Sequence, residues 1–228
     1  EQTPARHAPP LIDFVRHEVV STPDPRLTVA RAPSGPQAAS FRALRRGLLE
    51  KDDRTPKVIA VAGAGSGDGR SYCAANLALA LAETKTHKVL LIEANTREPA
   101  IAELFDIPNP PDAVGQVADH RRAPEAAWRI VELADAGLHV LPVAPRSDRP
   151  RVIDGPGFAR AIERLRDAYD YIVVDTPAVL SGPDLGLIEH VVDVVLLATR
   201  SSRSRGRDLK AAVGQITARK LFGVVLVD

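Results

Sequence analysis

The stretch from Val58 to Leu81 constrains the fold more than any other part of this 228-residue chain. A short β-branched apolar run leads into a loop with glycine at 63, 65, 67 and 69, and an alanine- and leucine-rich segment with good helix propensity follows. Glycine has no Cβ, so such a loop can adopt positive φ and turn several backbone N–H groups toward one point. The start of the helix adds its own unpaired donors. The sequence therefore predicts a strand, an anion-binding loop and a helix, with phosphate as the expected anion.

The loop from Ala64 to Ser71 has the spacing of a phosphate loop (Walker A), written A-x-x-x-x-G-R-S, with two departures. Alanine replaces the first glycine, and Arg70 stands where a lysine is expected. Arginine keeps the charge, but its planar fork is not equivalent to a compact ammonium between the β- and γ-phosphates. A glycine-rich turn without a ligand is the alternative. The predicted nucleotide-binding residues are Gly65, Ser66, Gly67, Asp68, Gly69, Arg70, Ser71 and Tyr72.

Further apolar runs predict buried strands, and helical stretches separate most of them. Each run is continuous, as strands buried on both faces require. The alternation predicts an α/β fold with three layers, a mainly parallel sheet with helices on both faces, of the P-loop NTPase type. Ligands of such sheets bind beyond the carboxyl ends of the strands. The predicted strands cover 88–93, 138–142, 169–175, 192–198 and 222–227, and the predicted helices cover 124–133, 158–168 and 207–217.

Acidic residues end two of the predicted strands at the edge where the glycine loop opens. Asp175, in I-V-V-D-T-P, stands where a P-loop protein places the carboxylate that holds Mg²⁺ or its water, and Ser71 offers a hydroxyl for the same metal. Glu93, in L-L-I-E-A-N-T-R, is a second acid at a strand end. The alternatives are an aspartate that caps the next turn and a solvated strand-end glutamate. The predicted catalytic residues are Asp175, Glu93 and Arg70, and the predicted metal ligands are Ser71, Asp175 and Glu93.

A Rossmann-type dinucleotide site is a second interpretation of the glycine loop, with Glu93 on a ribose. The G-x-G-x-x-G spacing fails, because its last position is Asp68 counted from Gly63 and Arg70 counted from Gly65. A carboxylate at Asp68 would also lie close to a pyrophosphate unless it turned outward. The phosphate-loop interpretation is therefore preferred.

Composition narrows the class of protein. With 45% hydrophobic residues the chain can bury a full core. The net charge of +1 argues against a generally basic surface, so no nucleic-acid partner is expected. The single cysteine, Cys73, excludes an internal disulfide and is expected to be a buried thiol. The sequence contains no run of eighteen apolar residues and no signal-peptide pattern, and the absence of methionine indicates a processed chain or part of a longer protein.

The two ends of the chain carry basic segments. Residues 1–36 are rich in Pro and Arg and are predicted to be a linker or docking arm, largely without its own core, before a P-loop kinase-like domain at 37–228. That domain is expected to begin with an amphipathic helix over 37–50. The arginine-rich cluster 200–207 follows a predicted strand, where it could contact an adenine, an acidic lipid surface or a partner. A solvated basic loop is the alternative.

Taken together, the glycine loop, the run L-L-I-E-A-N-T-R-E-P and the run Y-D-Y-I-V-V-D-T-P-A resemble the cytoplasmic domain of bacterial tyrosine kinases. These form the capsular-exopolysaccharide branch of the ParA and MinD group of P-loop proteins. The resemblance covers about residues 36–228 and includes F-R-A-L-R at 41–45. It implies ATP or ADP with Mg²⁺, a membrane-embedded polysaccharide co-polymerase or activator as partner, and homo-oligomers formed through the helix 37–50. It also implies a cytoplasmic protein held at the inner membrane by that partner.

Departures from the family pattern point to impaired catalysis. The loop lysine is Arg70, and the family's second acidic motif, D-x-D, is here Glu93 and Asn95. Phosphoryl transfer depends almost entirely on positioning and charge stabilisation, so these changes favour a pseudokinase with weak or structural nucleotide binding. Its hypothesised role is to regulate exopolysaccharide or capsule chain length and export. The alternatives are an active autophosphorylating tyrosine kinase or ATPase, and a ParA-like partitioning protein that binds DNA or a membrane surface.

Overall fold

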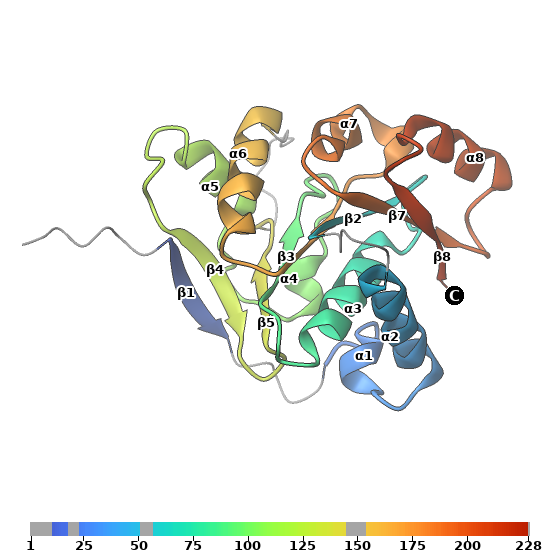
Figure 1. The fold of residues 1–228 in the computed structure, drawn as a ribbon, viewed down its shortest axis with the longest axis horizontal. Helices are drawn as coiled ribbons and strands as arrows, with labels where there is room; N and C mark the ends of the chain where they lie inside the picture. Colours follow the sequence, from blue (N-terminus) through green and yellow to red (C-terminus); the bar gives the residue numbers. More distant parts are fainter. Residues whose placement is uncertain (1–10, 18–22, 51–56, 145–153, 228) are drawn as a thin grey trace, which may run out of the picture.

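An eight-stranded sheet forms the centre of the computed structural model, which describes residues 11–17, 23–50, 57–144 and 154–227 (Figure 1). The strand order is β1-β4-β5-β3-β6-β2-β7-β8, and all neighbouring strands are parallel except β4 and β5. The strands are β1 (Ile12–His17), β2 (Val58–Gly63), β3 (Val89–Glu93), β4 (Trp128–Leu133), β5 (Leu138–Leu141), β6 (Tyr171–Asp175), β7 (Val194–Arg200) and β8 (Leu221–Val227).

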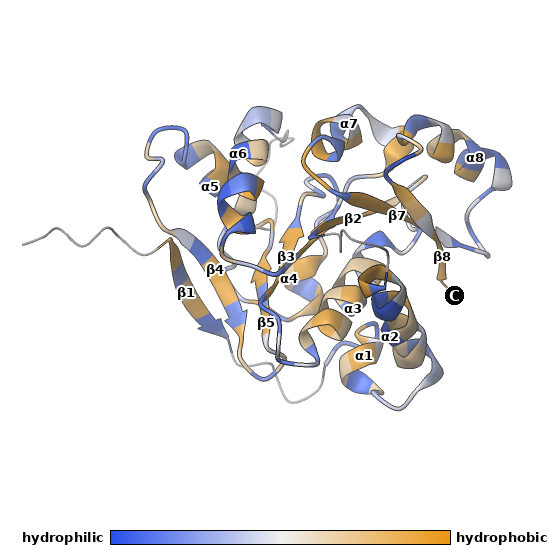
Figure 2. Ribbon diagram, in the orientation of Figure 1, coloured by the Kyte–Doolittle hydropathy of each residue, from blue (hydrophilic) through white to orange (hydrophobic). Residues whose placement is uncertain are grey.

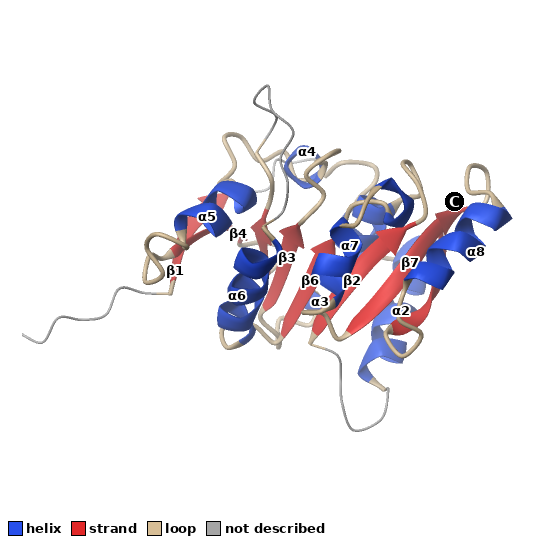
Figure 3. Cartoon of the chain, turned by 90° about the horizontal axis from the view of Figure 1, so that it is seen from above, coloured by secondary structure: helices blue, strands red, loops and turns tan. Residues whose placement is uncertain are grey.

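Helices cover both faces of this sheet. In Figure 3, α2 and α3 lie on one face and α6, α7 and α8 on the other, which confirms the predicted three-layer α/β fold of the P-loop NTPase type. The α-helices are α1 (Thr28–Arg31), α2 (Pro36–Leu49), α3 (Arg70–Ala82), α4 (Ile101–Leu104), α5 (Ala113–Asp119), α6 (Gly155–Arg166), α7 (Asp184–Glu189) and α8 (Gly206–Gln215), and a 3₁₀ turn, η1, covers Val179–Ser181.

The central strands are buried on both faces, which explains their continuous apolar sequences. Along β2, Ile59 and Val61 pack into the core beneath α2 and α3, while Val58 and Ala60 pack into the core beneath α6 and α7. The hydropathy colouring of Figure 2 shows the same strands as apolar along their length. Because successive side chains point to opposite faces, both cores need an apolar residue at every position. The five strands predicted from these runs are confirmed.

The prediction of a helix over 124–133 is wrong. Residues Trp128–Leu133 form β4, which pairs antiparallel with β5 and parallel with β1. The sequence W-R-I-V-E-L is a short apolar run with two adjacent β-branched residues, and periodicity alone does not distinguish a strand from a helix over such a length. Pairing with residues distant in the sequence decides the outcome.

The described part of the predicted N-terminal arm packs against the domain. Residues Ile12–His17 form the edge strand β1, in register with β4 from Ile12 opposite Trp128. Leu27 and Val29 are buried in the core that also contains α3. The arm was expected to be largely without its own core, and its described residues pack on the sheet and core of the domain at 12–17 and 27–31. Residues 1–10 and 18–22 lie outside the described residues.

The helix expected over 37–50 is present as α2 and packs on α3. Phe41 and Leu48 are buried, and Arg42 Nε donates to Glu83 Oε2 at 2.7 Å. Of the helices that the structure describes, none combines the length and the apolar character needed to cross a bilayer.

Candidate nucleotide-binding site

The glycine loop lies at the carboxyl ends of the parallel strands, as predicted. It connects Gly63, the last residue of β2, to Arg70, the first residue of α3. Two acids end the strands on the same side of β2: Glu93 ends β3, Asp175 ends β6, and the two are register partners. Strand, loop and helix thus gather the predicted site residues at one edge of the sheet.

The loop carries a run of backbone donors that are unpaired within the described residues. Gly67 and Gly69 have φ values of +80° and +84°, a conformation that residues with a Cβ rarely adopt. Gly65 N donates to Asp68 Oδ2 at 2.8 Å. For the N–H groups of residues 66–72, the described part of the chain offers no hydrogen-bond acceptor. A run of unpaired donors at the start of a helix is the arrangement that binds phosphate.

Ser71 and Asp175 form the pair that a P-loop protein uses to hold Mg²⁺. Ser71 Oγ donates to Asp175 Oδ2 at 2.6 Å, and Asp175 is fully buried. Its other oxygen, Oδ1, has no hydrogen-bond partner among the described residues. Burial raises the pKa of the Asp175 carboxyl to about 6, opposed by the Ser71 hydrogen bond and the charge of Arg70. An unpartnered carboxylate oxygen beside a hydroxyl fits a hydrated magnesium ion.

The metal would need phosphate oxygens to complete its coordination. Within the residues that the structure describes, no group of three or more His, Cys, Asp or Glu side chains is placed to hold a metal ion. Magnesium typically binds through one or two protein ligands together with substrate phosphates and water. The residues present therefore fit a nucleotide-bound metal rather than a metal held by the protein alone.

Glu93 lies beside Asp175, but its oxygens are occupied by backbone amides. Oε1 accepts from Ala100 N at 2.5 Å and from Ile101 N at 3.0 Å, and Oε2 accepts from Val143 N at 2.8 Å. Burial, followed by repulsion from Asp175, raises the pKa of Glu93 to about 8. The carboxyl group thus connects the start of α4 to the segment after β5. This geometry favours a structural role over the predicted role as a metal ligand.

Arg70 points along the end of the sheet rather than into solvent. Its side chain is 5% exposed, and Nη1 donates to the carbonyl oxygen of Thr176 at 3.1 Å. Its Nη2 lies 3.4 Å from Glu98 Oε2. A Cβ on Gly63 would stand 2.8 Å from Arg70 Cγ, so the glycine makes room for this side chain. Glu98 also accepts from Ser66 Oγ at 2.8 Å. The sequence reasoning did not identify Glu98 as part of the site.

Asp68 turns toward the segment that follows β7. It is 3% exposed and accepts from Ser204 Oγ at 2.6 Å, in addition to Gly65 N. Ser204 Oγ in turn accepts from Arg200 N at 2.9 Å. The carboxylate therefore accepts hydrogen bonds from Gly65 of the loop and from Ser204 of the arginine-rich cluster 200–207, which the structure places against the glycine loop. Ser204 was not singled out from the sequence.

Tyr72 and Cys73 follow the loop but face the protein interior. Tyr72 Oη lies 3.3 Å from Thr28 Oγ1, and its ring meets Phe41 edge-on with centroids 5.6 Å apart. The Tyr72 side chain thus packs on α1 and α2. Of this predicted nucleotide-binding residue, only the backbone N–H is left to contact a phosphate on the loop. Cys73 is buried as expected, and burial raises the pKa of its thiol to about 12.

Together, the parallel sheet, the glycine loop and the Ser71 and Asp175 pair define an α/β protein of the P-loop NTPase type. No family model matches the chain. Among curated proteins, the chain is 26% identical over 198 residues to the tyrosine-protein kinase YwqD of Bacillus subtilis, covering 85% of this chain and 82% of YwqD. It is 27% identical over 173 residues to the tyrosine-protein kinase CpsD of Streptococcus pneumoniae, covering 75% of each.

EpsB of Ralstonia solanacearum, whose name describes a candidate tyrosine-protein kinase, is 28% identical over 192 residues. The match covers 83% of this chain but only 25% of EpsB, so the chain spans about a quarter of that protein.

Solved structures show the same fold. The chimerical protein CapA2B2 matches with a TM-score of 0.77 at 24% identity, covering 95% of this chain and 93% of that structure. The VpsO kinase domain has a TM-score of 0.71 at 26% identity, covering 83% and 93%. MinD of Pyrococcus horikoshii, solved with Mg-ADP, has a TM-score of 0.61 at 19% identity, covering 75% and 68%. The resemblance to bacterial tyrosine kinases and to the MinD type of P-loop protein is confirmed.

Proposed function

We propose that the chain is a tyrosine-kinase-like P-loop regulator that binds ADP or ATP with Mg²⁺ weakly and does not transfer phosphate to tyrosine. The observation that supports this most directly is the contrast between two loop residues. Ser71 keeps its 2.6 Å hydrogen bond to Asp175, whose second oxygen is unpartnered, whereas Arg70 is bonded to the Thr176 carbonyl. Groups for binding a metal nucleotide remain, while the group expected between the β- and γ-phosphates has changed.

The site keeps one feature that would assist catalysis and has two that weaken it. A bound Mg²⁺ would neutralise phosphate charge between Ser71 and Asp175. Glu93 does not add a free carboxylate, because three backbone amides occupy its oxygens. Arg70 is held by Thr176 and lies close to Glu98, whose charge offsets part of its own. Positioning and charge supply nearly all of the rate in phosphoryl transfer, so such changes reduce turnover more than binding.

The tyrosines of the chain support the same proposal. The chain has three tyrosines, and all lie in described residues. Tyr169 and Tyr171 are 2% and 8% exposed, and Tyr72 is half-buried against Phe41. None of the three projects freely as an acceptor for phosphate from another molecule.

The biological role that we propose rests on the relatives. Several similar proteins are named as tyrosine-protein kinases, and the resemblance in sequence implies a role in exopolysaccharide or capsule chain length and export. We propose the same setting for this chain, as a cytoplasmic subunit held at the inner membrane by a membrane-embedded co-polymerase or activator. Homo-oligomers through α2 would use Arg46, whose side chain is 72% exposed, because Arg42 and Arg45 already bond to α3 of the same chain.

Nucleotide calorimetry together with a phosphorylation assay tests this function. We expect saturable, magnesium-dependent binding of ADP, and no transfer of labelled phosphate from ATP either to the chain or to an added tyrosine-containing polymer. Magnesium-dependent binding with rapid tyrosine phosphorylation would favour the active kinase instead. Absence of any nucleotide binding would contradict both interpretations.

A ParA-like protein that binds DNA or a membrane surface is the second candidate. The similarity to MinD structures in fold and the exposed Arg207 side chain at the start of α8 favour it. Binding to DNA or to acidic vesicles should then fall with salt and disappear when Arg203, Arg205 and Arg207 are replaced by glutamine.

A further inference from the structure

A surface pocket separate from the glycine loop lies between β4, α5 and α6. It has a volume of about 200 Å³, and its lining includes Arg121, Arg160, Arg164, His120 and Trp128. None of the residues that line it belongs to the glycine loop or to the Ser71 and Asp175 pair. Nucleotide binding at the glycine loop therefore does not explain this pocket.

Three arginines bring positive charge to the pocket, and two of them pair with carboxylates that are not part of its lining. Arg121 Nη1 lies 3.3 Å from Asp154 Oδ2, and Arg164 Nη2 lies 3.9 Å from Glu125 Oε2. Glu125 is 90% exposed, so the second pair is weak. In the described part of the chain, Arg160 has no carboxylate partner, and its side chain is exposed. The pocket thus keeps at least one guanidinium available for an anion.

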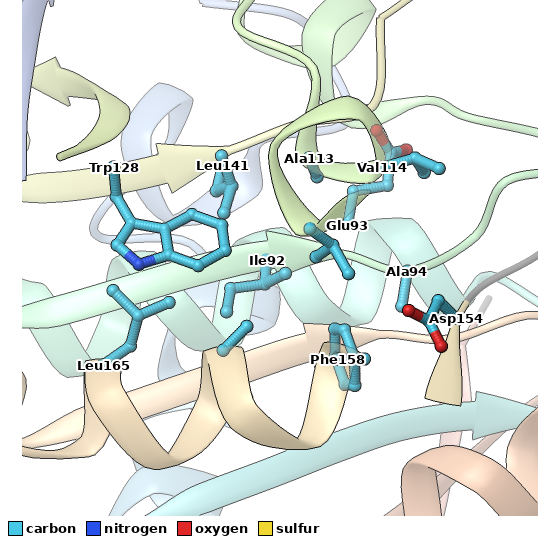
Figure 4. A pocket seen from close by; sticks show the side chains of 12 residues that line it. Ile92, Glu93, Ala94, Ala113, Val114, Trp128, Leu141, Asp154, Phe158 and Leu165 are labelled. Atoms are coloured by element: carbon cyan, nitrogen blue, oxygen red, sulfur yellow. The ribbon is translucent and has the colours of Figure 1, made fainter. Parts of the chain in front are cut away.

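Trp128, one of the residues that line the pocket, carries a buried donor without an acceptor among the described residues. Trp128 is 1% exposed, and its Nε1 finds no hydrogen-bond partner among the described residues. Figure 4 shows a neighbouring apolar cavity that Trp128 also lines, with the indole nitrogen on the ring edge that faces Leu165 of α6. A buried donor left unpaired in a native fold calls for an explanation, and a ligand oxygen is one.

His120 holds the indole in place and adds an aromatic face. The two rings stack with centroids 3.8 Å apart and an interplanar angle of 7°. The ring nitrogens of His120 lie 2.7 Å from Gln116 O and 2.9 Å from Ala126 O, which fixes the imidazole over Trp128. The pocket thus combines an aromatic wall with donors from the turn after α5, from α6 and from β4.

We propose that this pocket binds a small phosphate monoester carried on a single ring. The polar groups that it offers are donors, and guanidinium groups match the geometry of phosphate oxygens. The apolar and aromatic wall suits a ring, and the volume limits the ligand to about one ring and its phosphate. A sugar phosphate and an aryl phosphate share this chemistry.

The only tryptophan of the chain lies in the pocket, so its fluorescence reports binding directly. Titration without magnesium or nucleotide uses glucose 1-phosphate, phenyl phosphate and inorganic phosphate, with glucose as the uncharged control. We expect a saturable change with at least one of the two esters, binding at least tenfold weaker for inorganic phosphate, and none for glucose. The ester that binds more tightly identifies the ring as a sugar or an aryl group.

Arg160→Gln and Arg219→Gln form a matched pair of variants, since both remove one exposed arginine charge. We expect Arg160→Gln to weaken ester binding about tenfold and Arg219→Gln to leave it unchanged. Trp128→Phe, followed by calorimetry, should also weaken binding because it removes the indole N–H. Equal affinities of the two arginine variants, equal affinity for inorganic phosphate and both esters, or no saturable signal would overturn the proposal. Nucleotide binding at the glycine loop is measured separately, so either proposal can fail alone.

Discussion

Arg203 lies across Gly67, so that a Cβ built on Gly67 would stand 2.6 Å from Arg203 Nη1. Glycine is required at position 67 for two reasons. A side chain would clash with Arg203, and residues with a Cβ rarely adopt the φ of +80°. Arg203 comes from the turn after β7, and Ser204 beside it bonds to Asp68 of the loop. In the described residues no carboxylate pairs with Arg203. The turn thus brings a second guanidinium to a loop whose own arginine, Arg70, is directed toward Thr176.

We expect Arg203→Gln to weaken binding of ADP with magnesium about tenfold. A charge-assisted hydrogen bond contributes about 1.5–3 kcal/mol, and Arg203 is placed to donate to a phosphate on the loop. Calorimetry gives the affinity, and Arg219→Gln controls for the loss of one surface charge. An unchanged dissociation constant for Arg203→Gln would show that the guanidinium only covers the loop.

Nucleotide binding should depend on pH through Asp175. Burial raises the pKa of its carboxyl to about 6, and the ionised form is the one that attracts a cation. The magnesium-dependent part of the ADP affinity should therefore increase as pH rises from 5 to 7. Calorimetry with and without magnesium measures this part across the range. In Asp175→Asn both the magnesium effect and its pH dependence should disappear, and their persistence would place the metal elsewhere.

The same carboxyl should lower the stability of the free protein at neutral pH. Its folded-state pKa of about 6 lies above the ordinary value of 3.8, so the folded state binds the proton more tightly. The contribution of Asp175 to the free energy of unfolding then decreases as pH rises from about 4 to about 6, by up to about 3 kcal/mol. Asp175→Asn keeps the shape without the charge. Urea unfolding should show it more stable than the parent at pH 7.5, with a smaller difference at pH 4.5; equal differences at both pH values would contradict this.

The sequence predicts the centre of this fold well because its strands are buried on both faces. Residues 58–63 and 171–175 are apolar at nearly every position, and each face meets its own helical layer. The edge strand β1 was missed and β4 was mistaken for a helix. Both depend on pairing between Ile12 and Trp128, which lie far apart in the chain, and local propensity carries no information about such pairing.

In the candidate site too, the sequence identifies some residues and their roles, whereas others are identified only from the structure. Ser71 and Asp175 were found together because a loop spacing and a strand end fix both positions. The role of Glu93 depends on amides of Ala100, Ile101 and Val143, which only the folded chain brings to it. Glu98 was missed because it lies in a turn with no recognisable metal or phosphate spacing. Motifs therefore located the site, while the assignment of each carboxylate required the tertiary contacts.

Asn76 should be the main anchor of the segment before α2. It is fully buried, accepts from Val29 N at 2.9 Å and donates to Arg26 O at 2.8 Å. Asn76→Ala would leave these backbone groups unpaired, at a cost of about 2–4 kcal/mol. Urea unfolding measures the loss, and trypsin should cleave faster after Arg26 and Arg31. Gln215→Ala, at an exposed position of α8, is the control. Unchanged cleavage would show that Leu27 and Val29 hold the segment alone.

Arg70→Lys tests whether Arg70 alone prevents phosphate transfer or whether other residues of the site also do so. The shorter lysine cannot reproduce both the bond to Thr176 O and the approach to Glu98, so the free energy of unfolding should fall by about 1–2 kcal/mol. A compact ammonium in the loop should improve ADP binding a few-fold. Tyrosine phosphorylation should stay undetectable, because the amides of Ala100, Ile101 and Val143 still occupy Glu93.

The comparison between Arg70→Lys and Arg70→Gln separates charge from geometry. Both variants lose the buried guanidinium, but only the lysine places a cation in the loop. A labelled-phosphate assay on both variants, with the same tyrosine-containing polymer as substrate, gives the turnover. If Arg70→Lys alone raises turnover by several orders of magnitude, the site has a single defect and the chain is an enzyme with one altered residue. The other outcome is that neither variant gains activity while Arg70→Lys binds ADP more tightly. Nucleotide binding would then be restored without phosphate transfer, because Glu93 at the end of β3 remains hydrogen-bonded to backbone amides.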